Sequence, residues 1–152
     1  MQPQRVIINN RFSSVCYHAL FTLAVFLFTH TASAQFNQYR NYNVSDGLPS
    51  SDVYDMMQDA SGYLWFTTDM GASRFDGYEF RNFSNENGLP DNTIFRVIED
   101  KKGRVWFLSF SGKLSYYFKD HIYTLPCNTR LEELIKGSMM TSLYIDAGDT
   151  VW

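Results

Sequence analysis

The amino-acid sequence predicts an all-β protein built from repeated four-stranded antiparallel meanders. One observation is composition: aromatic residues make up 17% of the 152 residues, with 13 Phe, 10 Tyr and 3 Trp against only 4 Pro. Large aromatic side chains are enriched in strands, where they can be buried. The second observation is a set of short motifs that recurs at a fixed spacing, which is typical of repeat architectures. A chain of this length forms at most one domain.

Charge and cysteine content exclude several classes of protein. The sequence has 13 Lys and Arg against 16 Asp and Glu, a formal net charge of −3. This balance argues against a strongly basic nucleic-acid-binding protein and against a charge-driven disordered tail. Two cysteines are too few for a disulfide scaffold or a Cys-rich zinc site. We therefore expect no nucleic acid as a partner of this segment.

Residues 1–34 have the pattern of a secretory signal peptide. Arg5 and Arg11 give a positively charged start, and an apolar run follows over residues 19–28. That run is about half of the roughly 20 residues that a membrane-spanning helix needs. The small residues at 32–34 (Ala-Ser-Ala) match a cleavage site. An uncleaved anchor is the alternative interpretation.

After removal of this segment, residues 35–152 offer little for catalysis or metal binding. Cys127 is the one thiol left and His121 the one histidine. We interpret Cys127 as a small buried hydrophobe, because a cysteine nucleophile needs a base beside it. One His and one Cys are also too few ligands for zinc. The sequence therefore predicts no catalytic residue, no metal site and no cofactor.

Two motifs, Gly-Leu-Pro and Asp-x-x-Gly-x-x-Trp, each recur 41 positions further along the chain. The residues of the repeated motifs are Gly47, Leu48, Pro49, Asp59, Gly62, Trp65, Gly88, Leu89, Pro90, Asp100, Gly103 and Trp106. A third, partial copy has Asp146 and Trp152, 46 positions after the second. The larger offset indicates an insertion of about five residues, which we place within residues 126–138.

Each copy contains four short apolar runs joined by turn signals, which predicts four strands. In the first copy the runs are 53–58, 63–68, 72–75 and 78–83, and in the second copy they are 94–99, 104–109, 113–118 and 121–125. The Asp76-Gly77 pair predicts a two-residue hairpin turn. The third copy is expected to begin with a strand over 140–145. One or two helical turns are expected at 131–136, inside the insertion.

A four-stranded meander that repeats every 40–50 residues is typical of a β-propeller blade. We therefore expect a partial propeller over residues 35–152, with about two and a half blades. The expected limits are 39–83 for the first blade, 84–125 for the second, 126–138 for the insertion and 139–152 for the start of the third.

The repeated motif residues are interpreted as structural. The Asp side chain can accept backbone N–H bonds across the turn, and the Gly can adopt the positive φ that the turn needs. The Trp then fills the space between blades. Calcium binding by Asp59 or Asp100 is the alternative, but calcium needs six to eight oxygen ligands and this motif provides one carboxylate.

Strands in a meander alternate in direction, so the connections at 69–71 and 84–91 are expected on one face of the ring. The turns at 59–62 and 76–77 are expected on the other face. We predict that a ligand binds at the first face, whose connections differ more between the copies; solvated loops with no contact role are the alternative. The candidate residues on this face are Ser50, Ser51, Asp52, Asp69, Met70, Asp91, Asn92, Phe110 and Ser111.

The first copy resembles the two-component regulator propeller repeat. The resemblance lies in the segments Asp46-Gly47-Leu48-Pro49-Ser50-Ser51, Asp59-x-x-Gly62-Tyr63-Leu64-Trp65-Phe66-Thr67-Thr68 and Gly71-x-x-Arg74-Phe75-Asp76-Gly77. The second copy departs from this pattern at residues 108–111 (Leu-Ser-Phe-Ser), and the third stops within the motif. The resemblance extends over residues 36–152.

The resemblance implies an exported sensor region, which in this family precedes a further β-domain, a membrane helix and a cytoplasmic histidine kinase. It therefore implies that this chain is the N-terminal part of a two-component sensor, on the periplasmic side and tethered to the inner membrane in the full-length protein. The implied partners are a small-molecule or oligosaccharide ligand, the remaining blades, the downstream signalling domains and a second copy in a homodimer. An exported propeller that acts as a scaffold or as part of a polysaccharide-active enzyme is the alternative.

Overall fold

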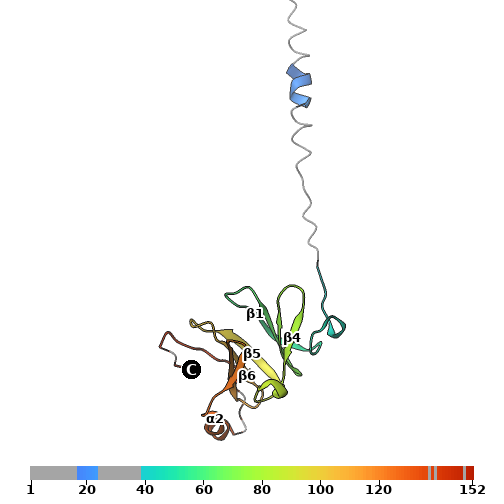
Figure 1. Ribbon diagram of the computed structural model, residues 1–152. Coiled ribbons are helices and arrows are strands. Elements are labelled where there is room, and N and C mark those ends of the chain that lie inside the picture. Colours follow the sequence, from blue (N-terminus) through green and yellow to red (C-terminus); the bar gives the residue numbers. More distant parts are fainter. Residues whose placement is uncertain (1–16, 24–38, 137, 139, 149) are drawn as a thin grey trace, which may run out of the picture. The chain divides into compact units, whose positions relative to one another are not determined.

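The computed structural model describes residues 17–23, 39–136, 138, 140–148 and 150–152 (Figure 1). The chain divides into two units, Met1–Arg40 and Asn41–Trp152. In the first unit, residues 17–23 are helical. Most of the predicted signal peptide, including its cleavage site, lies outside the described residues and stays a prediction. None of the helices in the described ranges is long and apolar enough to cross a bilayer.

The second unit contains two four-stranded antiparallel sheets, which confirms the predicted fold class of propeller blades (Figure 1). In both sheets the order in space follows the order in sequence, as in a meander. The first sheet consists of β1 (Val53–Gln58), β2 (Leu64–Thr68), β3 (Gly71–Phe75) and β4 (Phe80–Phe83). The second consists of β5 (Ile94–Glu99), β6 (Val105–Ser109), β7 (Leu114–Phe118) and β8 (His121–Thr124). All eight predicted strands are therefore present.

The hairpin turn at Asp76-Gly77 is longer than predicted. Phe75 pairs with Phe80, so the loop has four residues rather than two. The Asp76 carboxylate accepts hydrogen bonds from the backbone N–H groups of Tyr78 and Glu79, and this local capping favours the wider turn. In the second sheet the equivalent turn does have two residues, Lys119 and Asp120, and both have positive φ.

The connection before each sheet contains a short 3₁₀ helix, η2 (Val44–Asp46) or η3 (Asn85–Asn87). Both begin with a capping box and end at a glycine with φ near +100°. The glycine leads directly into the Leu and Pro of the repeated motif. Leu48 and Leu89 are buried, so the same local chemistry anchors both connections.

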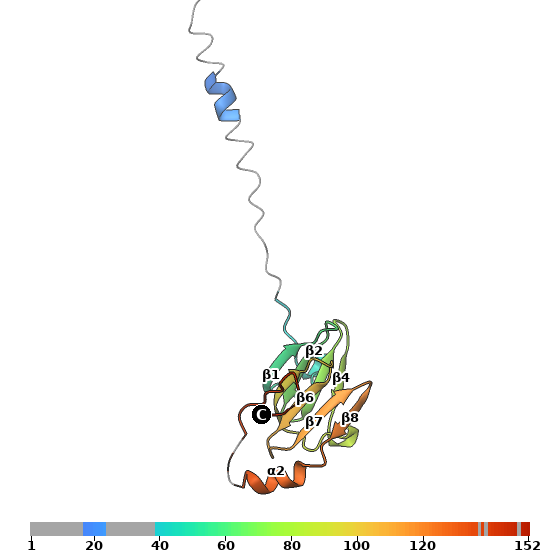
Figure 2. The ribbon, with the colours of Figure 1, turned by 90° about the vertical axis from the view of Figure 1, so that its left-hand side faces the viewer.

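The segment after β8 differs from the prediction at three points. The helix α2 (Asn128–Leu134) begins three residues earlier than expected and lies at one end of the second sheet (Figure 2). The side-chain amide of Asn128 exchanges two hydrogen bonds with the backbone of Leu114, which fixes the start of α2 against β7. Cys127 precedes α2 and is exposed, so its interpretation as a buried residue is wrong.

The strand expected at 140–145 is also absent from the described residues. Ile145 forms an isolated antiparallel bridge with Val151, and Tyr144 exchanges two backbone hydrogen bonds with Trp152. A strand needs a hydrogen-bonded partner along its length. Here the pairing is limited to the few residues around the Asp146 turn.

The two sheets share one hydrophobic core. Its buried members come from both sheets and from the connection between them: Trp65, Ala72, Phe83, Leu89, Ile94, Val97, Val105 and Phe107. A second cluster lies on the other face of the second sheet, where Trp106, Leu108 and Leu114 pack with Leu143 of the third copy. The face of each blade that bears the motif Trp is therefore covered by the residues that follow it in sequence.

Candidate functional site

The predicted ligand-binding face is formed by the connections into β1 and β5 and by the β2–β3 and β6–β7 turns. Val53 at the start of β1 pairs with Thr68, which places residues 50–52 near the Asp69-Met70 turn. In the second sheet, the Asp91 carboxylate accepts hydrogen bonds from the backbone N–H groups of Thr93 and Ser111. The structure thus brings Asp91 and Ser111 into contact and places residues 50–52 close to the Asp69-Met70 turn.

Thr93 joins the two blades at this face. Its hydroxyl donates to the backbone oxygen of Asp69 at 3.4 Å, and its own carbonyl oxygen accepts from the N–H of Phe110 at 2.8 Å. Asn92 points elsewhere, because its side-chain oxygen accepts from the N–H of Asn85 in the same connection. One carboxylate oxygen of Asp69, Oδ1, is buried and has no hydrogen-bond partner.

Two aromatic residues at this face, Tyr54 and Phe95, were not among the predicted site residues. In each sheet the register of the first two strands shifts at one position, between Val53 and Asp55 and between Ile94 and Arg96. Tyr54 and Phe95 are the extra residues of these two β-bulges, and a bulge redirects its side chain. Both are aromatic and 41 positions apart in the sequence, which is the signal that could have identified them.

Tyr54, Phe95 and Phe110 form an aromatic cluster, which we call the aromatic trio. The ring centroids of Tyr54 and Phe95 are 5.0 Å apart, and those of Phe95 and Phe110 are 5.5 Å apart. Both pairs meet edge to face. Tyr54 is 47% exposed and Phe110 is 56% exposed, so the trio is accessible from solvent.

The inner strands β1 and β5 are joined by a carboxylate. Oδ2 of Asp55 accepts from the backbone N–H of Val97 at 3.1 Å and lies 3.7 Å from a guanidinium nitrogen of Arg96. The position of Asp55 in the first copy is that of Arg96 in the second. Equivalent positions of successive blades therefore carry opposite charges and pair across the boundary.

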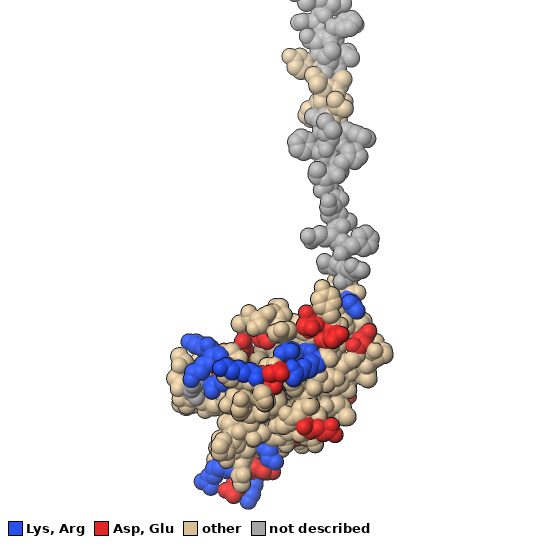
Figure 3. Space-filling view, viewed as in Figure 1, with Lys and Arg blue, Asp and Glu red and all other residues tan. Residues whose placement is uncertain are grey.

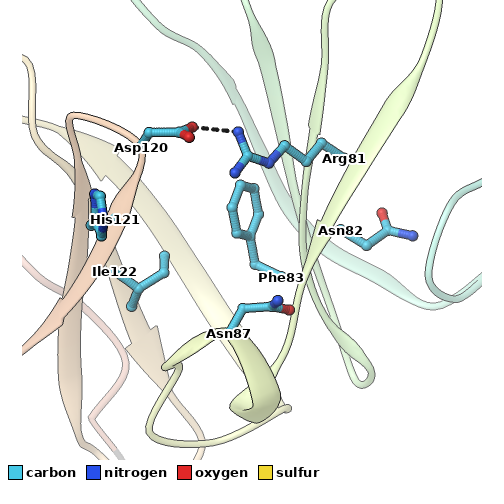
Figure 4. A pocket seen from close by; sticks show the side chains of 7 residues that line it. All are labelled: Arg81, Asn82, Phe83, Asn87, Asp120, His121 and Ile122. Carbon is cyan, nitrogen blue, oxygen red and sulfur yellow. Dashed lines mark hydrogen bonds and ion pairs between the residues drawn. The ribbon is translucent and has the colours of Figure 1, made fainter.

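A hollow lies between the outer strands β4 and β8, as Figure 4 shows. It is a crevice of about 220 Å³, lined by Arg81, Asn82, Phe83, Asn87, Asp120, His121 and Ile122. Arg81 and Asp120 form an ion pair across it, with the guanidinium above the Phe83 ring. Several lining groups already serve the fold: Asn82 bonds Ser73 and the Gly47 carbonyl, and Asn87 caps η3.

Titratable groups around this crevice form one network between the blades. The hydrogen bond to Arg81, followed by the one from the Tyr117 hydroxyl, lowers the pKa of Asp120 below its ordinary value. Burial raises the pKa of Tyr117, whose hydroxyl also accepts from Arg74 at 2.7 Å. Arg74 and Arg81 belong to the first blade and Tyr117 and Asp120 to the second. The network therefore stabilises the contact between blades.

The repeated Asp and Trp form a clamp in all three copies. The indole N–H donates to the Asp carboxylate at 2.7 Å for Trp65 and Asp59, at 2.8 Å for Trp106 and Asp100, and at 3.1 Å for Trp152 and Asp146. The other carboxylate oxygen accepts backbone N–H groups of the turn. Each of the three carboxylates thus accepts at least three hydrogen bonds from protein donors. Among the described residues there is no cluster of three or more potential metal ligands.

Asp100 shows the electrostatics of this clamp. Burial alone would raise its pKa, but the hydrogen bonds from Trp106 and Arg104 and from the backbone N–H of Lys102 outweigh burial and lower the pKa. Nε of Arg104 lies 2.5 Å from its carboxylate. The ionised form of Asp100 is therefore part of the folded structure.

Charges are mixed on the face of the molecule that Figure 3 draws. Most of that face is uncharged; blue side chains form a row across the globular part, and red side chains lie beside and above this row. This distribution agrees with the small net charge of −3.

The sequence profile of the two-component regulator propeller family matches residues 47–70 and 88–111. None of the curated proteins matches the chain significantly. Among solved structures, the chain is similar to the extracellular domain of a hybrid two-component system from B. thetaiotaomicron, with a TM-score of 0.60 and 23% identity. That match covers 74% of this chain and 16% of the other.

The chain is also similar in fold to a catalytically inactive virginiamycin B lyase from Staphylococcus aureus, solved with quinupristin. The TM-score is 0.51 at 20% identity, over 69% of this chain and 36% of that one. The chain thus spans about a sixth and about a third of the two structures. At these identities the likeness is one of fold, and both matches support the blade architecture.

Proposed function

We propose that the chain is the N-terminal part of the ligand-sensing propeller of a two-component sensor, because residues 47–70 and 88–111 match the two-component regulator propeller family. The parent protein is then a membrane histidine kinase, and the propeller lies on the periplasmic side of the inner membrane. The chain itself has no catalytic role in this proposal. It contributes blades and part of a binding face.

The observation that carries this proposal is the position of the repeats. They directly follow a segment with the pattern of a secretory signal peptide, and they fold as propeller blades. An exported propeller cannot itself phosphorylate a cytoplasmic protein, so its contribution to such a system is to bind on the outside. The loops around the aromatic trio supply an accessible face for that binding.

Export can be tested with a reporter that is active only after secretion. Residues 1–34 are fused to alkaline phosphatase that lacks its own leader, and we expect activity in intact cells. Leu27→Arg interrupts the apolar run and should abolish export, whereas Asn37→Ser in a longer fusion of residues 1–40 lies outside the run and should leave it unchanged. Equal activity of the Leu27→Arg fusion would contradict the proposal.

The sensor role is tested on the protein encoded by the intact gene, in membranes supplied with labelled ATP. We expect label on a histidine and, in the coding sequence after Trp152, further copies of the repeat followed by an apolar span of about 20 residues. A protein without a membrane span that releases new reducing ends from polysaccharides would instead identify an exported enzyme or its scaffold.

A further inference from the structure

We propose that residues 39–42 form the fourth strand of a split blade, whose other three strands belong to the last blade of the same propeller. This inference rests on the part of the proposed function that gives the parent protein further blades. The split blade packs on the side of the first sheet opposite Trp65, which we call the leading face. The side chains of the leading face come from all four strands: Met56, Leu64, Phe66, Phe75 and Phe80.

The sequence of residues 39–42 repeats that of a fourth strand. Tyr-Arg-Asn-Tyr at 39–42 corresponds to Phe-Arg-Asn-Phe at 80–83, which is β4, 41 positions later. The connections that follow also match, since each begins with a capping box, passes through a 3₁₀ helix and ends in Gly-Leu-Pro. Residues 39–42 lie outside the eight strands of the two sheets. They therefore stand in the chain where the fourth strand of a preceding blade would stand.

Tyr42 makes the contact of a fourth-strand residue with the first sheet. Between the two blades, the ring of Phe83 in β4 meets that of Tyr117 edge to face at 5.4 Å. Before the first blade, the ring of Tyr42 meets that of Phe75 edge to face at 4.9 Å. Phe75 and Tyr117 occupy equivalent positions of β3 and β7, and equivalent positions of a repeat make equivalent contacts with their neighbours. Tyr42 therefore takes the place of a residue from a preceding blade.

The connection after Tyr42 packs on the first blade as its counterpart packs on the second. A Cβ atom at Gly47 would lie 3.4 Å from Cβ of Phe80, and one at Gly88 would lie 3.5 Å from Cβ of Ile122. Phe80 and Ile122 occupy equivalent positions of β4 and β8. A second, separate contact thus gives this segment the same role as the end of β4 and the connection that follows it.

The described residues leave the leading face of the first sheet less covered than its counterpart in the second sheet. Val97 and Phe107 of the second sheet are 3% and 0% exposed, because both pack in the core that includes Trp65. At the equivalent positions of the first sheet, Met56 is 67% exposed and Phe66 is half-buried. The cover that fits this face is therefore another sheet with the chemistry of the first one.

The contacts of Trp65 define the chemistry of the partner. Its indole lies 5.7 Å from the ring of Phe107 in the next blade and stacks at 5.6 Å on Phe83 of its own fourth strand. The equivalent rings before the first blade are Phe66 and Tyr42. The partner is thus a blade whose second strand carries the Trp of an Asp-x-x-Gly-x-x-Trp motif and whose third strand has an open edge. An open edge pairs readily with another strand, and this pairing closes the ring of blades.

The first test is hydrogen exchange, monitored by mass spectrometry, in the protein encoded by the intact gene. Backbone N–H groups that are paired in a sheet exchange slowly. We expect peptides that cover residues 39–42 to exchange at least about tenfold more slowly than an unfolded chain, as peptides that cover 80–83 should. Protection that is present at 80–83 but absent at 39–42 would overturn the inference.

A photo-crosslinker then identifies the partner. Met56 is replaced by p-benzoylphenylalanine, and the intact protein is irradiated. We expect a cross-link within one polypeptide, to a peptide that contains a later Asp-x-x-Gly-x-x-Trp motif. The matched control carries the same group at Tyr78, which is 90% exposed in the β3–β4 loop, and should not reach that peptide. A covalent dimer or a cross-link to a different protein would overturn closure by the same chain.

Tyr42→Ala tests whether the two ends of the propeller are coupled. Loss of this ring uncovers the partner's Trp, so exchange should accelerate about threefold or more in the peptide that contains it. Tyr78→Ala, which also removes a Tyr ring, should leave that peptide unchanged. Equal exchange of that peptide in the parent protein and in Tyr42→Ala would contradict the contact.

The outcome is separable from that of the sensor function. Protection at residues 39–42 in a protein that does not phosphorylate a histidine would refute the sensor function and support the split blade. Histidine phosphorylation in a protein without protection at 39–42 would refute the split blade alone.

Discussion

At the scale of single residues, the Asp–Trp clamp is the feature that the sequence repeats most faithfully. One carboxylate closes the turn through backbone N–H groups and holds the indole N–H six positions later. The copies differ in what covers the ring: Trp65 and Trp106 are buried at 0% and 4% exposure, whereas Trp152 is 72% exposed. The clamp therefore depends only on residues within one copy of the motif. Burial of the ring depends on residues elsewhere in the chain.

Substitution of Asp100 should be more costly than substitution of Asp146. Asp100→Asn removes a charged acceptor from Trp106 and Arg104 in a buried setting, so we expect it to lower the free energy of unfolding by about 1–3 kcal/mol. Asp146→Asn affects a bond to an exposed ring and should cost less than about 1 kcal/mol. Urea unfolding at pH 7 measures both, and equal losses would contradict this account.

The lowered pKa of Asp100 predicts a pH dependence of stability, which a comparison of the parent chain with Asp100→Asn can measure. The pKa of Asp100 is lowered in the folded state, so its stabilising contribution is present above the pKa of an unfolded aspartate, about 3.9. That contribution is lost as the pH falls through the lower folded pKa. The difference in unfolding free energy between the parent chain and Asp100→Asn should be constant from pH 7 to 5 and shrink below about pH 4. If this difference in unfolding free energy grew as the pH fell, the pKa of Asp100 could not be lowered in the folded state.

At the scale of elements, the close approach of β3 to β4 depends on Gly71. A Cβ atom at this position would lie 2.1 Å from the carbonyl oxygen of Phe83, and the backbone φ is +127°. The neighbouring backbone cannot move away without breaking the sheet. Gly62 also has positive φ, at +91°, but a Cβ there would meet nothing within 4 Å.

These two glycines form a matched pair for mutation. Gly62→Ala should cost about 1–2 kcal/mol of stability, because only the left-handed conformation is strained. Gly71→Ala adds the backbone clash and should cost about 2–5 kcal/mol. Thermal or urea unfolding compares the stability of the two variants. A loss of stability in Gly71→Ala no larger than in Gly62→Ala would show that the β4 backbone moves to accommodate the added methyl group.

At the scale of the whole molecule, the described blades are joined by contacts between successive copies of the repeat. Trp65 packs in one core with Phe107 of the second sheet, while Asp55 and Glu99 bond backbone N–H groups across the boundary. On the outer side, Arg81 pairs with Asp120. The second sheet is therefore not an independent unit.

Removal of Trp65 should loosen both sheets. Trp65→Ala leaves a cavity in the shared core and is expected to cost about 3–5 kcal/mol. Hydrogen exchange monitored by mass spectrometry should then accelerate in peptides of β2 and also of β6. Tyr78→Ala, which removes an exposed ring, serves as the control and should leave exchange unchanged. Acceleration confined to the first sheet would show that the blades unfold separately.

The sequence predicts the repeated elements well because each is specified by local chemistry. The turn glycines, the capping residues and the apolar runs lie within a few positions of the strands that they define. The four-residue loop after Phe75 was missed because Asp76-Gly77 alone does not reveal the bonds from Asp76 to Tyr78 and Glu79. The prediction of a strand at 140–145 was wrong because the pairing of a strand depends on a partner elsewhere in the chain.

Strand alternation placed Phe110 on the candidate face, but it did not place Tyr54 and Phe95 there. Tyr54 and Phe95 read as ordinary strand residues, and only the register shift shows that each is the extra residue of a bulge. The exposure of Cys127 was missed for a similar reason, since its environment is set by the start of α2. The direction and exposure of these side chains depend on how strands pair and where α2 begins, which single residues in the sequence do not reveal.

The direction in which each tryptophan is covered has a consequence for biogenesis. Trp65 is shielded by residues that follow it, and so is Trp106. A polypeptide that emerges from a translocation channel amino end first would complete each blade only when the next one arrives. The propeller would then fold blade by blade from its amino end, and the Trp of the newest blade would stay uncovered until the next blade forms. During a pause in synthesis, that indole would be the surface most accessible to a chaperone.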